Sequence, residues 1–430
     1  MDNNKTGNRK QVNILEASIG VDIGKYQHVA VAQSWDGRRL KPLLFDNNLQ
    51  GFNKLWEYRS KAKECLGVSD VRFALEPTGQ YWKALAEWLE RKPAEVRMVQ
   101  PAHTHKAKEL EDNSPGKHDI KDAGVISDLD IQRKSLNLVR PQGVFAELRY
   151  LTICRQGLVK DLNREVNRLH RLMDVLFPEL IGLFKNYIGK GLLELVKTAA
   201  CPDQMVRLGE QAIKDLLKKK SKGTLGLERA RAIMNAAGNS IGIREGREAL
   251  ELELRQLLVR MELVRQQLSE IELTINGVIK KVPYIEILSS IPQVGQITLA
   301  AILGEAGDFR QYQNARQIIK LAGLNLYEIS SGQHHGRKRI TKRGRPLLRQ
   351  MLYLAGLRLI KQKGAFYQFY KRLVEKGKAK PQAIVAMGCK LLRVLFAMVR
   401  NNSKFKEQDE SPLSRLGGIN QIRALPLIGA

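Results

Sequence analysis

Residues 17–24 read ASIGVDIG, residues 28–35 read HVAVAQSW and residues 41–46 read KPLLFD. These apolar runs are separated by turn residues, notably Asp36-Gly37, and they predict three successive strands, two of them paired as a hairpin. The pattern becomes helical from Leu49 to Cys65, and residues 71–79, VRFALEPTG, then predict a buried fourth strand that ends at Glu76. The stretch thus predicts the start of an α/β domain.

The following residues extend the same domain to about residue 140. Residues 81–90, YWKALAEWLE, have the apolar spacing of an amphipathic helix, and residues 96–101, VRMVQP, predict a fifth strand. Strands and helices in this order predict a mixed sheet with helices packed on its faces. We therefore expect a first domain at residues 1–140.

Four acidic residues in this domain are candidates for a metal centre. Asp22 lies within an apolar strand and Glu76 closes another, where an unsatisfied carboxylate costs several kcal/mol. Asp119 and Asp122 are spaced i, i+3, which places them on one face of a helix. Four converging carboxylates would repel one another without a cation, and Mg²⁺ prefers oxygen ligands. The pattern favours a nuclease-like centre with two metal ions.

Each acid also has an ordinary interpretation. Asp22 and Glu76 would serve equally as polar ends of buried strands. Asp119 and Asp122 would serve as charges on an exposed helix face, because Asp112, Asp128 and Asp130 are close to them in the sequence.

The composition favours a polyanionic partner. The chain has 430 residues, too many for one typical core, with 72 Lys and Arg against 44 Asp and Glu, a formal net charge of +28. Such an excess favours nucleic acid, because each phosphate contact releases counterions. No apolar run of about 18 residues and no secretory signal core is found, so we expect a cytoplasmic protein without a membrane partner. The four cysteines have no zinc-site or disulfide spacing.

The middle of the chain, residues 141–280, has two long helical patterns. Leucines between residues 145 and 176 recur at threes and fours, and apolar residues between Leu250 and Ile275 do so over about four heptads, which predicts a coiled coil. The two helices could pair with each other in antiparallel fashion or with copies in another subunit. A helical insertion at about 188–246 contains the basic run KKKSKG, a candidate for backbone contact with nucleic acid.

Residues 281–400 predict a helical third domain, followed by a polar tail at 401–430. Residues 287–307 read ILSSIPQVGQITLAAILGEAG, two apolar helical stretches joined by a tight turn that could offer backbone N–H groups to a phosphate, as in helix-hairpin-helix motifs. Further along, Ser330 to Arg349 reads SSGQHHGRKRITKRGRPLLR, with two adjacent serine hydroxyls, six Lys and Arg between Arg337 and Arg345, and no acid. By itself this stretch is equally typical of a solvated basic loop.

Taken in order, these motifs resemble a known family. Asp22 within GVDIGK, Glu76 within LEPTG, the D-x-x-D-A of Asp119 and Asp122, then IPQVG, LAGL, SSG and ITKRG-x-x-LR are similar to the DEDD transposases of the IS one-ten and IS eleven-eleven families of bacterial insertion sequences, relatives of the pilin-gene invertases. The resemblance covers nearly the whole chain. Two departures stand out: PQVG replaces the usual PGVG, and Ser330 duplicates the hydroxyl of Ser331.

The resemblance implies a RuvC-like domain with the RNase H fold, a coiled-coil middle and a helical C-terminal domain that supplies a catalytic serine. It implies that Asp22, Glu76, Asp119 and Asp122 bind Mg²⁺, with Mn²⁺ as a substitute, and that Ser331 forms a covalent link to DNA. It also implies a bridge RNA as guide, dimers that pair into tetramers, and action on donor and target double-stranded DNA at the bacterial nucleoid.

The basic residues beside the serine complete the predicted site. We expect them to neutralise phosphate oxygens and hold the strand; they are Arg337, Lys338, Arg339, Lys342, Arg343 and Arg345. Two other functions fit the same residues. One is a metal-dependent nuclease or junction resolvase that activates water, with Ser331 as a phosphate contact, and the other is a nucleic-acid-binding protein without activity.

Overall fold

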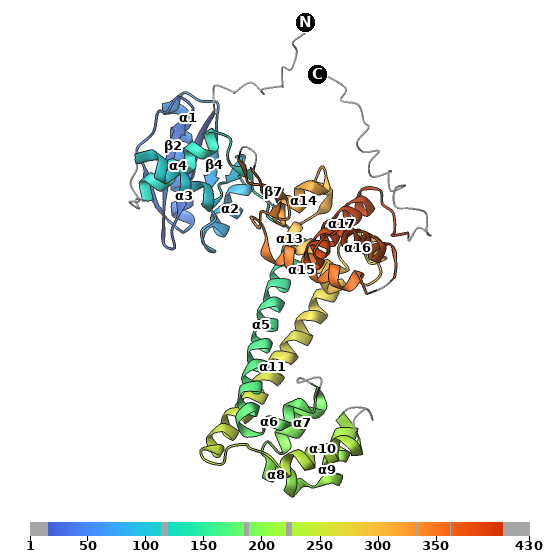
Figure 1. Ribbon diagram of the computed structural model, residues 1–430. Coiled ribbons are helices and arrows are strands. Elements are labelled where there is room, and N and C mark those ends of the chain that lie inside the picture. Colours follow the sequence, from blue (N-terminus) through green and yellow to red (C-terminus); the bar gives the residue numbers. More distant parts are fainter. Residues whose placement is uncertain are drawn as a thin grey trace. The chain divides into compact units, whose positions relative to one another are not determined.

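The computed structural model describes residues 16–112, 119–184, 189–220, 226–331, 334–336, 338–361 and 363–406. The chain divides into two compact units, Met1–Val139 and Arg140–Ala430. The first unit contains a six-stranded mixed sheet, and the second is built almost entirely from helices (Figure 1).

The sheet of the first unit has the strand order β3-β2-β1-β4-β5-β6. β1 is antiparallel to β2 and parallel to β4, so the strand that contains Asp22 and the strand that Glu76 follows run side by side in the same direction. The strands are β1 (Glu16–Ile23), β2 (Gln27–Ser34), β3 (Leu43–Asp46), β4 (Asp70–Leu75), β5 (Val96–Met98) and β6 (Leu136–Asn137).

Helices pack on this sheet, and the alternation of side chains along β1 decides which of its residues meet which helices. Ile19 and Val21 join a core with Leu55 and Leu85, which come from α1 and α2. The intervening residues of β1 face the other side of the sheet, where α4 packs. The helices of this unit are α1 (Leu49–Leu66), α2 (Trp82–Glu90), α3 (Pro101–Asp112) and α4 (Asp119–Ile131).

The second unit contains two 33-residue helices, α5 (Val144–Leu176) and α11 (Arg247–Ile279), which lie side by side (Figure 1). Leu148 near the start of α5 shares a core with Ile275 near the end of α11. Leu169 near the end of α5 shares a second core with Leu257 nearer the start of α11. The two helices therefore pair with each other in antiparallel fashion, one of the two arrangements that the sequence left open.

The segment between α5 and α11 folds into short helices that have their own core. Apolar side chains such as Leu195, Ile213 and Ile233 pack there against Leu172 and Leu257 of the two long helices. The short helices are α6 (Pro178–Gly182), α7 (Lys190–Thr198), α8 (Pro202–Leu208), α9 (Glu210–Lys220) and α10 (Leu227–Gly238).

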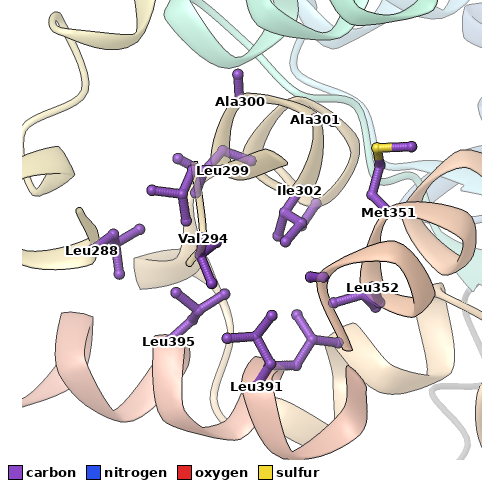
Figure 2. Close-up of a cluster of buried hydrophobic side chains, with 14 of the residues drawn as sticks. Leu288, Val294, Leu299, Ala300, Ala301, Ile302, Met351, Leu352, Leu391 and Leu395 are labelled. Atoms are coloured by element: carbon purple, nitrogen blue, oxygen red, sulfur yellow. The ribbon is translucent and has the colours of Figure 1, made fainter. Parts of the chain in front are cut away.

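The remaining helices surround the other core of this unit. Figure 2 shows Leu288, Leu299 and Ile302 packed toward Leu352 and Leu391. The elements are α12 (Ile285–Leu288), α13 (Gln296–Ala306), the short 3-10 helix η1 (Phe309–Gln311), α14 (Ala315–Leu321), α15 (Pro346–Leu359), α16 (Ala365–Glu375) and α17 (Lys380–Arg400). α17 is long and apolar enough to cross a membrane by length and composition, but its apolar side lies in this core.

Four two-residue strands lie between α14 and α15. β7 (Leu326–Tyr327) pairs with β10 (Arg339–Ile340), and β8 (Ser330–Ser331) pairs with β9 (His334–His335), both in antiparallel fashion. The mixed sheet followed by helices confirms the expected fold class, an RNase H-like domain followed by helical domains.

Candidate active site

Asp22 and Glu76 lie next to each other at one edge of the sheet. Val21 of β1 pairs with Leu75 of β4 in the parallel register, so the next residue on each chain segment is one of the two acids. Val21 and Leu75 point into the core with α1 and α2. Because successive side chains alternate, Asp22 and Glu76 point to the opposite face, where α4 packs.

α4 approaches β1 closely because residue 20 is glycine. A Cβ atom on Gly20 would lie 2.1 Å from the carbonyl oxygen of Ala123 and 2.4 Å from the amide nitrogen of Ser127. The Ser127 hydroxyl donates a hydrogen bond of 2.9 Å to the Ser18 carbonyl oxygen. From Ser18 to Gly20 the contacts of β1 thus move toward the beginning of α4. The next residue of β1 on this face is Asp22, which faces the first turn of α4.

That first turn contains Asp119 and Asp122, and both lie close enough to Asp22 for their charges to act on it. The pKa of Asp22 is raised to about 6, first by burial and then by the negative charges of Asp122, Asp119 and Glu76. Asp119 and Asp122 also lie in the first turn of α4, at the positive end of the helix dipole. The other three carboxylates thus all act on Asp22, and the four acids are together called the acidic centre below.

Lys108 belongs to the acidic centre, although no sequence pattern pointed to it. Its Nζ atom lies 2.5 Å from Oδ2 of Asp122, a carboxylate whose side chain is only 3% exposed. Its charge is the one influence that lowers the pKa of Asp22, against burial and the other acids. Lys108 comes from α3, and in the sequence it is one of several basic residues, so only the packing of α3 on α4 distinguishes it.

Two observations favour a divalent cation in the acidic centre. Its donors are all carboxylate oxygens, the ligands that Mg²⁺ prefers. Oδ1 of Asp122 is buried and has no hydrogen-bond partner in the described part of the chain, so it is available to a cation. The spacing is not yet that of a formed site, because the described residues include no group of three or more acidic, histidine or cysteine side chains placed to hold a metal ion.

The other acids of α4 have structural partners. Asp128 accepts hydrogen bonds from Gln33 and Arg39, and its Oδ2 lies 2.7 Å from the Arg39 guanidinium. Asp130 is buried and bonds to Arg72 and Ser135. Their charges are therefore satisfied within the sheet and its loops. These partners, Arg39 and Arg72, belong to the sheet and its loops, so Asp128 and Asp130 are assigned to the fold and not to the acidic centre, a distinction that the sequence could not make.

The predicted serine, Ser331, lies in the second unit, where it is the second residue of the short strand β8. Ser331 pairs with His334, and Ser330 with His335. The side chains of these four residues lie outside what the structure describes. The choice between Ser331 and Ser330 as nucleophile therefore stays a prediction.

The segment after the serine is held against the end of α14 by two glycines. A Cβ on Gly344 would lie 2.3 Å from the Leu321 carbonyl oxygen, and one on Gly323 would lie 2.9 Å from the backbone carbon of Lys342. The Lys342 amide donates to the Gly323 carbonyl at 2.9 Å, and the Arg345 amide donates to the Leu321 carbonyl at 2.8 Å. The motifs LAGL and ITKRG are therefore two halves of one backbone contact.

Four of the six predicted cations lie exposed on this segment. Lys338, Arg339, Lys342 and Arg343 are open to solvent, and Lys338 Nζ lies 3.7 Å from a Glu328 carboxylate oxygen. Arg337 lies outside the described residues.

Arg345 has a different environment, which no sequence pattern indicated. Its guanidinium donates a hydrogen bond to the Glu305 carbonyl oxygen, and its Nε lies 3.9 Å from the buried Glu305 carboxylate. Burial, together with the nearby charge of Arg149, lowers the pKa of Arg345 to about 10. Arg149 also contacts Glu305, at 3.2 Å. These contacts tie the basic segment to α13, and the expected phosphate contact of Arg345 stays a prediction.

An RNase H-like sheet that gathers four carboxylates at one edge, followed by helices and an exposed basic segment, is the architecture of a DNA transposase or recombinase. Two family models agree. One is described as "Transposase" and matches residues 19–178. The other is described as "Transposase IS116/IS110/IS902 family" and matches residues 285–371.

Relatives extend the similarity over most of the chain. A protein of insertion element IS116 from Streptomyces clavuligerus is 26% identical over 391 residues, 90% of this chain and 95% of the relative. A protein of insertion element IS110 from Streptomyces coelicolor is 24% identical over 70% of this chain and 75% of the relative. A pilin gene-inverting protein from Moraxella bovis is 33% identical over 28% of this chain and 38% of its own. The chain belongs to the IS116/IS110/IS902 family of insertion-element transposases.

Proposed function

We propose that this transposase cuts and rejoins double-stranded DNA through a covalent phosphoserine intermediate. Asp22, Glu76, Asp119 and Asp122 hold two Mg²⁺ ions, or Mn²⁺, and Ser331 is the nucleophile. The observation that carries the proposal is the geometry at one edge of the sheet: the parallel register of β1 and β4 sets Asp22 beside Glu76, and the close approach of α4 at Gly20 brings its first turn toward them. Carboxylates gathered in this way repel one another, Lys108 offsets only part of the repulsion, and a pair of divalent cations would offset the rest.

The proposed chemistry divides between the two units. Bound Mg²⁺ would polarise the scissile phosphate and stabilise the charge that develops on its oxygens. The Ser331 hydroxyl loses its proton to a nearby base and attacks phosphorus, and the strand's deoxyribose oxygen leaves and takes up a proton. A hydroxyl of another strand then attacks the phosphoserine and releases Ser331, so the phosphodiester bond is conserved without ATP.

Lys338, Arg339, Lys342 and Arg343 support this proposal because they are exposed cations on the segment that follows the serine. In the proposed reaction they bind the phosphates that flank the scissile bond. Residues 1–140 supply the acids, residues 281–400 supply the serine and the basic segment, and residues 141–280 connect them. The acids and Ser331 lie in different units of the chain, so we propose that assembly on nucleic acid brings them together.

Two partners complete the proposal. A bridge RNA encoded by the element guides the protein to its donor and target DNA, and the active form is a dimer or a tetramer. The excess of basic residues supports binding to both nucleic acids. Sequencing of RNA that copurifies with the protein tests the guide, since a bound transcript that matches the flanks of its own gene is expected. Light scattering with and without that RNA tests the assembly.

A trapping experiment tests the serine chemistry. The protein is incubated with Mg²⁺ and suicide DNA substrates whose cleaved end cannot rejoin, and denaturing gels report a protein–DNA adduct. We expect an adduct with the native chain and with Ser330→Ala, and none with Ser331→Ala. Normal cleavage by Ser331→Ala, with no adduct from the native chain, would instead favour a nuclease that activates water.

The acids are tested on the same substrates with a matched pair on one helix. We expect Asp122→Asn to abolish cleavage while DNA binding remains. Asp128→Asn changes the same functional group on α4 outside the acidic centre, and we expect it to retain cleavage. Equal activity of the two variants would reject the role of the acidic centre.

A further inference from the structure

A second basic surface lies in the second unit, away in sequence from the serine and its basic segment. Residues 361–406 contain twelve Lys and Arg and a single acid, Glu375. That acid pairs with Lys371 on the same helix, at 3.6 Å. The other basic residues of this stretch therefore have no acid nearby in the sequence to balance them.

Three of these cations converge between α16 and α17. Lys390 and Arg393 are spaced i, i+3 on one face of α17, and Phe369 and Arg372 have the same spacing on α16, which packs against α17. Lys390 Nζ lies 5.9 Å from the centre of the Phe369 ring. The two pairs therefore face each other across the contact between the helices.

The environment of Lys390 is unfavourable for a charge in the protein by itself. Burial lowers its pKa, and the positive charges of Arg393 and Arg372 lower it further. Among the residues that the structure describes, none of the three cations forms an ion pair with an acid. The ring of Phe369 offers a weak compensation through its electron-rich face. The energetic cost remains until an anion binds.

We propose that Arg372, Lys390 and Arg393 form a binding site for the phosphodiester backbone of a nucleic acid. A phosphate is the ligand that fits, because it offers several charged oxygens to three converging cations and restores the balance of charge. These three residues are separate in sequence from the basic segment after Ser331. The inference rests on the proposed function only for the nature of the ligand, and it does not depend on the serine chemistry.

The test measures equilibrium binding of the full chain to a DNA duplex and to a structured RNA over a range of KCl concentrations. The triple variant Arg372→Gln, Lys390→Gln, Arg393→Gln should bind at least one of them about tenfold or more weakly at 0.1 M salt, with the slope of log affinity against log salt smaller by about 2 to 3. The nucleic acid that loses affinity identifies the strand that occupies the site.

The matched control removes three cations that are exposed and already paired with an acid four residues away: Arg91→Gln, Arg207→Gln and Lys371→Gln. It changes the net charge equally, and we expect less than about a threefold loss and an unchanged salt slope. Equal binding of the two triple variants to both nucleic acids would overturn the proposal.

Stability supplies a second readout. We expect the single variant Lys390→Met to melt at a higher temperature than the native chain while it binds nucleic acid more weakly, because it removes a desolvated charge. Lys390→Arg should keep the affinity. A lower melting temperature with unchanged affinity for Lys390→Met would show that Lys390 only supports the fold. Failure of the covalent trapping experiment leaves these results intact, so the two proposals are separable.

Discussion

Lys108 and Asp122 form an ion pair of 2.5 Å inside the acidic centre, so the cluster contains one built-in cation. The pair engages one oxygen of a buried carboxylate and leaves the other without a hydrogen-bond partner in the described structure. In the protein without metal, Lys108 therefore offsets part of the repulsion that a divalent cation would otherwise relieve.

Removing Lys108 should destabilise the metal-free protein. We expect Lys108→Met to lower the free energy of unfolding by about 1 to 3 kcal/mol, because a buried carboxylate loses its partner. Urea denaturation measures the change, and Lys106→Met, an exposed position on the same helix, is the control. Added Mg²⁺ should restore part of the loss. An equal effect of the two substitutions would show that the ion pair does not contribute.

The pH dependence of stability should report on Asp22. Its folded-state pKa of about 6 lies above its ordinary value of 3.8, so the folded state binds more protons between these values. Stability should therefore fall as pH rises from about 4 to 6, by on the order of 1 to 3 kcal/mol for this group.

Asp22→Asn tests that dependence, since it should be more stable than the native chain at pH 7 and show a flatter profile between pH 4 and 6. Thermal unfolding at a series of pH values measures both. Asp128→Asn removes a carboxylate that is paired with Arg39, so this variant should gain no stability at pH 7. A native profile that rises over this interval and is unchanged in Asp22→Asn would contradict the assignment.

The close approach of α4 to β1 should depend on Gly20. We expect Gly20→Ala to cost about 2 kcal/mol or more, because its Cβ would meet backbone atoms that cannot move independently of the helix. DNA cleavage should fall as well, because α4 positions two of the acids. Gly157→Ala is the control, since nothing lies within 4 Å of a Cβ there, and within α5 it should stabilise by about 0.5 to 1 kcal/mol.

The unusual PQVG turn should carry backbone strain. Gln293 has a φ of 66°, in the left-handed region where glycine is favoured, and it is exposed. We expect Gln293→Gly, which restores the family pattern, to stabilise the protein by about 0.5 to 1 kcal/mol in chemical denaturation. Gln296→Gly, at the first residue of α13, should destabilise it by a similar amount. A loss of stability in Gln293→Gly would mean that its side chain makes a compensating contact.

The sequence by itself predicted the first five strands and the helices of the first unit and the two long helices of the second, but not β6 or the short strands β7 to β10. Alternating apolar runs predicted β1, β2 and β4, and the heptad spacing predicted α5 and α11, because these periodicities are local properties of the chain. It also identified Asp22 and Glu76, since a carboxylate at the end of a buried strand is conspicuous without any knowledge of the fold.

Only the tertiary structure decided which side chains meet. Asp119 and Asp122 reach Asp22, whereas Asp128 pairs with Arg39, because Gly20 fixes how α4 lies on β1. The pairing of the two long helices, the contacts of Arg345 and the place of Lys108 were decided in the same way. These outcomes depend on contacts between residues far apart in the chain, where local periodicity carries no information about partners.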